Sequence, residues 1–265
     1  LSDEKIQLTS EYLQGVKSIG QNSLPSQPAT PLSQSALFTG APTKPQMGNE
    51  LLAEMRSADR VDILISFIKN SGLRILQEGF NDLRNRNIPV RIITTTYMGA
   101  TDPEAVNFLS CYPNAKIKVS YETKSTRLHA KAYYFHRESG FSTAYVGSSN
   151  MSNPAMTGGL EWNLKATQCD LPNILRAFEA EFDTYWSDPR FQEYSRDRDE
   201  NKLREALAAG RSEQGPGQNI ILFDVTPRAY QQRILDALEA ERTVRGSAKN
   251  LLVAATGTGK TVISA

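Results

Sequence analysis

Two short stretches of the sequence carry polar side chains whose types and spacing could act together on a phosphate ester. In the first stretch, His129 and Lys131 are two residues apart. In the second stretch, which begins at Gly147, Ser148 and Asn150 have the same spacing. Side chains two residues apart share one face of a β-strand, and a glycine lets another part of the backbone approach closely. These side chains are therefore expected to surround one bound phosphate.

The residue types predict phosphoryl transfer without a metal ion. A histidine titrates near neutral pH, so the free imidazole of His129 can attack phosphorus, and an imidazolium can protonate a leaving oxygen. The ammonium of Lys131 and the amide of Asn150 can stabilise the charge on the phosphoryl oxygens, as a metal ion does in many other enzymes. Two cysteines and two histidines in the whole chain do not provide a zinc site or a disulfide framework. We expect a reducing, cytoplasmic location and no metal here.

The combined pattern resembles a known superfamily. His129-x-Lys131, followed by a GSxN sequence from Gly147 to Asn150, is similar to the HxK and GSxN motif of the phospholipase D superfamily. Glu161 matches the acidic residue found downstream in nuclease members. The resemblance is strongest to phosphodiesterase domains fused in front of superfamily 2 helicases.

The resemblance implies a role for each residue of the site. His129 would be the nucleophile that forms a phosphohistidine, and Lys131 and Asn150 would bind the non-bridging oxygens. Glu161 would orient the imidazole through its other nitrogen, and Ser148 would help to hold the phosphate or a neighbouring side chain. Alternatives stay open, because Ser148 and Asn150 are also common turn residues and Glu161 is also typical of a solvated surface.

One position departs from the superfamily pattern. Five residues after Lys131, where an aspartate is usual, the sequence has His136. His129 and His136 are seven residues apart, so a regular strand places them on opposite faces. His136 is therefore interpreted as structural. It also leaves open a second hypothesis, in which the domain is a catalytically inactive module that positions DNA for a helicase.

The charge pattern favours a polyanionic substrate. The net charge of the chain is only +1, but basic residues gather around the motif. We expect the substrate to be DNA, with RNA as an alternative, rather than a lipid phosphodiester. The basic residues are Lys116, Lys118, Lys124 and Arg127, and the interleaved tyrosines are Tyr121, Tyr133 and Tyr134. Such tyrosines can stack on unpaired bases, but at strand positions at least one is expected in the core.

The single HxK motif predicts a homodimer. The two-step mechanism needs a nucleophilic and a protonating histidine, and one chain supplies one HxK motif. A two-fold axis beside the site would bring His129, Lys131 and Asn150 of both copies to one phosphate. The alternative is that His136 is the second histidine within one chain.

A second site is predicted near the end of the sequence. A strand-type run at 250–253 leads into a phosphate-binding loop at 254–261, which resembles motif I of superfamily 2 helicases. The segment 227–232 resembles their Q motif. The residues that the resemblance assigns to ATP and magnesium are Gln231, Gly257, Thr258, Gly259, Lys260 and Thr261. The acidic motif of such helicases would lie beyond Ala265, so this chain is expected to be a fragment that does not complete an ATPase cycle.

Alternating helices and strands position both sites. Helices are expected at 51–55, 73–83, 102–109, 171–186 and 197–209, and strands at 61–67, 89–94, 116–121, 128–136, 142–147 and 160–167. Four of these strands follow one another without a helix, so the sheet should be mixed. The predicted fold class is α/β, with a phospholipase D-like mixed β-sheet flanked by helices, followed by a truncated P-loop (RecA-like) helicase segment.

Composition and length give the domain boundaries. The 265 residues allow about one and a half domains. We expect an N-terminal helix and Ser/Pro-rich arm at 1–46, the phosphodiesterase domain at 47–210, a linker at 211–218 and the helicase fragment at 219–265. No run of 18 apolar residues and no secretory leader pattern are found, so no membrane association is expected.

Overall fold

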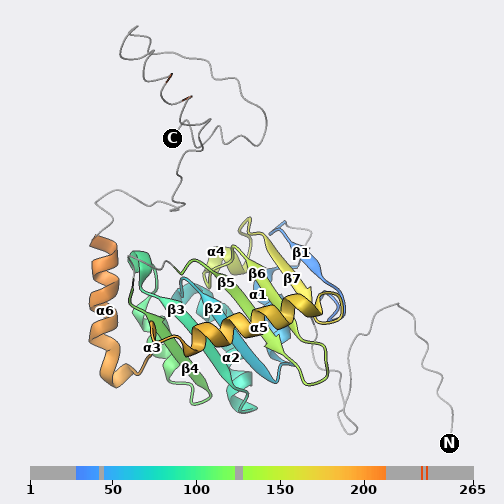
Figure 1. The fold of residues 1–265 in the computed structure, drawn as a ribbon, viewed down its shortest axis with the longest axis horizontal. Helices are drawn as coiled ribbons and strands as arrows, with labels where there is room; N and C mark the ends of the chain where they lie inside the picture. The colour runs from blue at the N-terminus through green and yellow to red at the C-terminus, as the bar shows by residue number, and fades with distance from the viewer. Residues whose placement is uncertain (1–27, 42–44, 123–127, 213–233, 235–236, 238–265) are drawn as a thin grey trace, which may run out of the picture. The chain divides into compact units, whose positions relative to one another are not determined.

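The computed structural model describes residues 28–41, 45–122 and 128–212, together with residues 234 and 237. The chain divides into two units, Leu1–Gly215 and Pro216–Ala265. The first unit contains every strand of the described residues (Figure 1). The fold of this unit is therefore what positions the predicted HxK site.

One mixed sheet organises the first unit. Within the described residues it has eight strands in the order β1-β7-β6-β5-β2-β3-β4-β8. Strands β2, β3 and β4 are parallel to one another, and every other neighbouring pair is antiparallel. The strands are β1 (Ala36–Phe38), β2 (Arg60–Ile65), β3 (Val90–Thr95), β4 (Ala115–Ser120), β5 (Lys131–His136), β6 (Thr143–Gly147), β7 (Asn163–Thr167) and β8 (Phe191–Glu193). The predicted α/β class with a mixed sheet is confirmed.

Helices cover both faces of this sheet. They are α1 (Met47–Met55), α2 (Asn70–Asn85), α3 (Pro103–Ser110), α4 (Asn153–Met156), α5 (Pro172–Ser187) and α6 (Arg196–Ser212), with a 3₁₀ turn, η1, at Tyr97–Gly99. In Figure 1, α5 runs across the front of the sheet, and α1 and α2 lie behind it. None of the helices in the described residues is both long and apolar enough to span a membrane.

Strand alternation divides the core between the two faces. Ile63 and Tyr133 point to the side of α1 and α2, where they share a cluster with Leu76. Leu64, next along the chain, points to the other side and packs with Phe182 of α5. Burial of a side chain of this size contributes about 1.5–3 kcal/mol relative to exposure in water. The two-residue period of the strands thus fixes which side chains can reach each face.

A buried ion cluster ties α1 to β6 and β7. The carboxylate of Glu54 is fully buried and lies 2.5 Å from the guanidinium of Arg137 and 3.0 Å from Nζ of Lys165. The hydroxyl groups of Thr143 and Tyr145 also donate to it, at 2.8 and 2.9 Å. Burial raises the pKa of Glu54, but the charges of Arg137 and Lys165 outweigh burial and hold the pKa below its ordinary value. The carboxylate is therefore ionised inside the core.

The structure differs from the sequence prediction at several short elements. β5 begins at Lys131 instead of residue 128, because its pairing with β2 starts there, opposite Ile65. β1 lies within the predicted arm and pairs with β7, and the short helix α4 interrupts the four strands that were expected to follow one another. β8 was also missed. Elements of three or four residues are too short to show a hydrophobic period, so the sequence pattern does not reveal them.

Candidate active site

The predicted motif residues come from one edge of the sheet. β5 is antiparallel to β2 and to β6, so the start of β5 lies beside the ends of those two strands. β7 is antiparallel to β6, and Gly147 at the end of β6 pairs with Asn163 at the start of β7. These four strands are neighbours in the order β7-β6-β5-β2 (Figure 1). The HxK stretch, the GSxN stretch and Glu161 therefore meet at the same edge.

Lys131 is a buried cation at this edge. Its side chain is only 6% exposed, and Nζ lies 5.9 Å from the centre of the Phe67 ring. Nζ donates one hydrogen bond, of 2.7 Å, to the main-chain oxygen of His129. Burial lowers the pKa of Lys131 to about 8, and the nearby carboxylate of Glu161 opposes this shift. An ammonium has three N–H donors, so Lys131 retains donors for a bound anion.

His129 lies just before β5 and is an exposed residue. Its ring centre is 6.5 Å from that of Phe67, and the two rings meet edge to face at 75°. Partial burial and the charge of Lys131 both lower the pKa of His129 below its ordinary value of 6.5. At neutral pH the imidazole is therefore mostly uncharged, which is the state that a nucleophile needs.

The turn after β6 places Asn150. The amide oxygen of Asn150 accepts a hydrogen bond of 3.1 Å from the backbone N–H of Phe67, which orients the side-chain amide. Its Nδ2 has no hydrogen-bond partner within the described residues, so it is left as a donor. Gly147 is required at the start of this turn, because a Cβ there would lie 2.1 Å from the main-chain oxygen of Trp162.

Ser148 is hydrogen-bonded to the chain that leads into β7. Its backbone N–H donates to the oxygen of Trp162 at 3.0 Å, and its hydroxyl accepts from the N–H of Trp162 at 3.0 Å. The hydroxyl of Ser148 thus holds the residue that follows Glu161. Both bonds go to the main chain of Trp162, and the two roles implied for Ser148, toward the phosphate or toward a neighbouring side chain, stay predictions.

Glu161 is half-buried and its carboxylate is close enough to act on two neighbours. Its negative charge raises the pKa of Lys131, which opposes the effect of burial on that residue. The same charge raises the pKa of Tyr133, in the same direction as the effect of burial there. Within the described residues, no hydrogen bond joins Glu161 to His129. The electrostatic partner that the structure gives to Glu161 is therefore Lys131, and an orienting role toward the imidazole stays a prediction.

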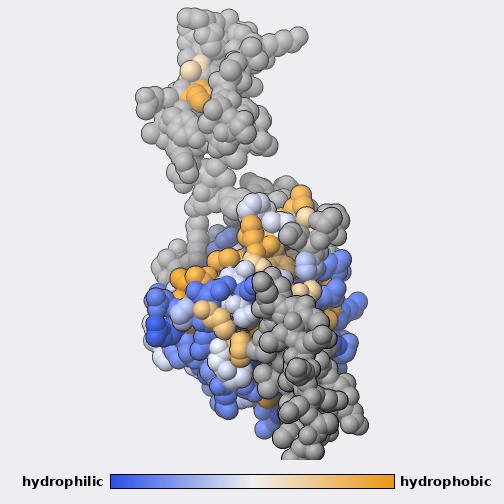
Figure 2. Space-filling model, turned by 90° about the vertical axis from the view of Figure 1, so that its right-hand side faces the viewer, coloured by the Kyte–Doolittle hydropathy of each residue, from blue (hydrophilic) through white to orange (hydrophobic). Residues whose placement is uncertain are grey.

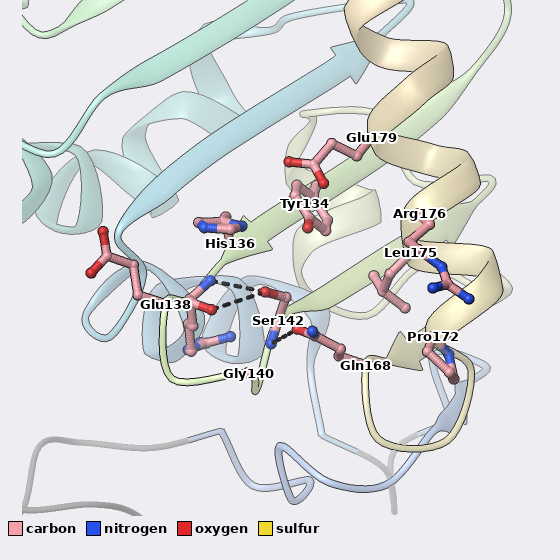
Figure 3. A pocket seen from close by; sticks show the side chains of 11 residues that line it. Tyr134, His136, Glu138, Gly140, Ser142, Gln168, Pro172, Leu175, Arg176 and Glu179 are labelled. Carbon is pink, nitrogen blue, oxygen red and sulfur yellow. Dashed lines mark hydrogen bonds between the residues drawn. The ribbon is translucent and has the colours of Figure 1, made fainter.

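His136 lies at the other end of β5 and on the other face. It accompanies Tyr134, with ring centres 6.2 Å apart, on the side covered by α5. Figure 3 shows both residues in the wall of a cavity of about 280 Å³, together with Leu175 and Glu179 of α5. The Nδ1 atom of His136 is buried without a hydrogen-bond partner among the described residues. Within one chain, His136 therefore does not approach the HxK edge.

The whole motif lies within a recognised domain family. The family described as "Cardiolipin synthase, PLD-like domain" matches residues 51–186, which is more than half of the chain. The chain belongs to the PLD-like domain family. A second family, "Type III restriction enzyme, res subunit", matches residues 224–265 at the end of the chain.

Solved structures similar to the PLD-like domain include two bacterial proteins, NucT and Nuc. NucT from Helicobacter pylori is 22% identical and covers 57% of this chain and 94% of its own, with a TM-score of 0.42. Nuc from Salmonella typhimurium, a phospholipase D family member, is 16% identical and covers 61% and 99%, with a TM-score of 0.44. Phosphatidylserine synthase from Haemophilus influenzae is 11% identical and covers 68% and 45%, with a TM-score of 0.45. No curated protein matches the chain.

The tyrosines of the PLD-like domain mostly belong to its core. Tyr133 and Tyr134 are 1% and 3% exposed, as expected for at least one of them. Among the basic residues, Nζ of Lys118 donates to the main-chain oxygen of Trp186 at 2.5 Å, whereas Lys116 is exposed. Lys124 and Arg127 lie outside the described residues, as do the predicted nucleotide-binding residues Gln231, Gly257, Thr258, Gly259, Lys260 and Thr261.

Two residues of this edge were not singled out from the sequence. Phe67 contacts His129 and Lys131 through its ring and Asn150 through its backbone N–H. Asn163 holds the middle of the GSxN turn by two hydrogen bonds. Their roles depend on which strands are neighbours in the sheet, and spacing along one strand does not contain that information.

Proposed function

We propose that the PLD-like domain is a metal-independent phosphodiesterase that cleaves DNA through a phosphohistidine on His129. The observation that carries the proposal is the pairing of an exposed, uncharged imidazole with the buried ammonium of Lys131 at one sheet edge. A nucleophile beside a fixed cation can attack a phosphate without a metal ion, because the cation stabilises the charge on the phosphoryl oxygens.

The reaction proceeds in two steps, formation of the phosphohistidine and its hydrolysis. A ring nitrogen of His129 attacks phosphorus, the P–N bond forms and the P–O bond to the leaving strand breaks. An imidazolium gives its proton to the leaving oxygen. In the second step, the imidazole that gave up its proton in the first step takes a proton from water. The hydroxide oxygen bonds to phosphorus, and the P–N bond breaks to release His129. Nζ of Lys131 and Nδ2 of Asn150 bind the non-bridging oxygens in both steps.

The second histidine is supplied by a second copy of the chain. His136 lies on the other face of β5, so one chain offers His129 alone at the site. A homodimer with a two-fold axis beside the site would provide both a nucleophile and an acid.

An uncharged surface next to the site supports this homodimer. Leu37, Leu164 and Val146 are neighbours in register across β1, β7 and β6, and they are 48%, 43% and 44% exposed. Trp162, which is hydrogen-bonded to Ser148, is 63% exposed. Figure 2 views the side of the domain that carries β1 and β7, where apolar surface is visible. Exposed apolar patches of this kind mark protein contacts, and an uncharged face can meet its own copy without repulsion between like charges.

DNA is the proposed substrate and a helicase is the proposed fusion partner. The match of residues 224–265 to the type III restriction res subunit supports a nucleic-acid motor after the PLD-like domain. In that motor, Lys260 would bind the phosphates of ATP and Thr261 would hold magnesium. Gln231 would contact the adenine. RNA remains the alternative polymer.

The test is cleavage of single- and double-stranded DNA by the full chain in EDTA. We expect cleavage by the wild type and by His136→Ala, and loss of cleavage in folded His129→Ala. His136→Ala is the matched control, because it removes the other histidine of the chain. DNA binding without cleavage by the wild type would instead support an inactive DNA-positioning module. Undiminished cleavage by His129→Ala would overturn the proposed nucleophile.

A further inference from the structure

Asn163 is the first residue of β7. Both the oxygen and the nitrogen of its side-chain amide form hydrogen bonds with one residue, Ser149. Its oxygen accepts a hydrogen bond of 3.3 Å from the backbone N–H of Ser149, and its nitrogen donates to the hydroxyl of Ser149 at 2.7 Å. The side chain of Asn163 is 3% exposed. A buried amide with both ends satisfied is held in one orientation, because rotation would break both hydrogen bonds.

Ser149 occupies the variable position of the GSxN turn. It is completely buried, and its main-chain oxygen accepts a hydrogen bond of 3.3 Å from the hydroxyl of Tyr133 in β5. The turn is therefore held at its middle residue from two strands, by Asn163 from β7 and by Tyr133 from β5. Asn150, which follows Ser149, has its amide oxygen bonded to the backbone N–H of Phe67.

The close approach of β7 to this turn depends on Gly147. A Cβ at position 147 would lie 2.5 Å from the amide oxygen of Asn163 and 2.6 Å from its Cα. The glycine of the motif thus makes room for the residue that holds Ser149. Lys165, the next residue on the same face of β7, is paired with Glu54 and not with the turn. Asn163 pairs with Gly147 and is therefore the residue of this face of β7 that contacts the GSxN turn.

We propose that Asn163 is a positioning residue of the active site, which sets the place of Asn150 by holding Ser149. The inference rests on the proposed cleavage function. Asn150 follows Ser149 directly, and its amide oxygen is bonded to the N–H of Phe67. Without Asn163, Ser149 loses both of its hydrogen bonds to β7, and the Nδ2 donor of Asn150 moves relative to Lys131.

The expected effect is on the chemical step. Binding of a phosphate in the transition state requires donors placed within about 0.5 Å, and a displacement of about 1 Å costs about 100-fold in rate. DNA binding depends mainly on cationic side chains, which Asn163→Ala leaves in place. Asn163→Ala should therefore lower kcat by about 10- to 100-fold and leave KM within about threefold of the wild type.

Asn107 provides a matched control. It is another buried asparagine, 7% exposed, and it lies in α3 instead of at the site. Its amide nitrogen donates to Glu200 at 2.9 Å, and its oxygen accepts from the hydroxyl of Tyr194. Asn107→Ala should lower the melting temperature about as much as Asn163→Ala but retain the wild-type kcat.

The experiment measures kcat, KM and melting temperature of the full chain for Asn163→Ala, Ser149→Ala, the double variant and Asn107→Ala, on an oligonucleotide in EDTA. If Asn163 acts through Ser149, the double variant is no slower than Asn163→Ala. The inference is overturned if Asn163→Ala keeps the wild-type kcat, if Asn107→Ala loses as much activity, or if the two single effects multiply in the double variant.

A second readout separates this inference from the proposed function. The side-chain NH₂ resonances of Asn150 should shift in Asn163→Ala and stay unchanged in Asn107→Ala, whether or not the protein cleaves DNA. A wild type without cleavage would refute the proposed function, and these resonances would still test the positioning. Unshifted Asn150 resonances in folded Asn163→Ala would refute the positioning role alone.

Discussion

The ammonium of Lys131 donates a hydrogen bond to the main-chain oxygen of His129, with Nζ 2.7 Å from that oxygen. The cation is thus fixed to the residue that carries the proposed nucleophile. Its charge helps to keep the imidazole of His129 neutral, and burial lowers its own pKa to about 8. Both shifts bear on the pH range in which the site can work.

We predict a bell-shaped pH dependence of kcat/KM in the free enzyme. Activity should rise as the His129 that attacks loses its proton, fall as the His129 of the second copy, which acts as the acid, loses its own proton, and fall further as Lys131 loses its proton near pH 8. Lys131→Arg is the control, because a guanidinium stays charged throughout this range. The variant should be slower and lack the further fall near pH 8. A fall near pH 8 that persists in Lys131→Arg would assign it to another group.

Gly147→Ala should abolish cleavage. The added Cβ would lie 2.1 Å from the oxygen of Trp162, so the turn or β7 must shift and Asn150 with it. We expect at least a 100-fold loss of kcat, since a shift of about 1 Å costs about that much. Gly158→Ala is the control, because a Cβ there meets nothing within 4 Å. Equal rates for the two variants would show that the close approach does not matter.

Leu164→Glu should convert the protein to a monomer without cleavage activity. The carboxylate would stand in the middle of the uncharged face formed with Leu37 and Val146, and like charges would then meet across the two-fold axis. Sedimentation velocity measures the change. Ile174→Glu, at a side chain of α5 that is 49% exposed, should remain dimeric. A wild type that is monomeric and fully active would rule out the homodimer.

Glu54→Ala should lower the free energy of unfolding by about 3–5 kcal/mol, because it leaves Arg137 and Lys165 buried without their counter-ion. Urea unfolding at pH 7 measures the loss. Glu78→Ala removes an exposed carboxylate paired with Arg56 and should cost no more than about 1 kcal/mol.

The same carboxylate predicts a pH effect on stability. The pKa of Glu54 is lower in the folded protein than in the unfolded chain, so its contribution is complete above the unfolded pKa. The contribution is lost as the pH falls through the folded pKa. In acid, the difference in stability between the wild type and Glu54→Ala should shrink, and a constant difference would contradict the ionised state.

Long elements of this fold could be predicted from the sequence, because their side chains repeat. The helical spacing of Leu73, Leu76, Phe80 and Leu83 gave α2, and the apolar run after residue 60 gave β2. Asp102 was expected to begin α3, and it does precede Pro103 there. Its carboxylate, however, accepts from the N–H of Asn70 at 2.9 Å and thereby serves the start of α2. That partner is distant in sequence, so the local pattern could not show it.

The site was predictable to a similar extent. The motif indicated which side chains could act on a phosphate. Strand parity placed His136 on the face opposite to His129, and the structure has His136 beside Tyr134 on the side of α5. His129 lies before β5, so strand parity does not apply to it; it lies near Lys131 beside the ring of Phe67, and its main-chain oxygen accepts a hydrogen bond from Lys131. The role of Asn163 arises from the pairing of β6 with β7, which no spacing along the chain specifies.

The central claim, that His129 is the nucleophile, is tested most directly by trapping the covalent intermediate. Labelled DNA is mixed with the full chain in EDTA, the reaction is stopped within one turnover in alkali, in which phosphohistidine survives, and the modified peptide is identified by mass spectrometry. We predict a DNA phosphate attached to His129, and no adduct in His129→Ala. An adduct on another residue, or cleavage that continues in folded His129→Ala, would contradict the account.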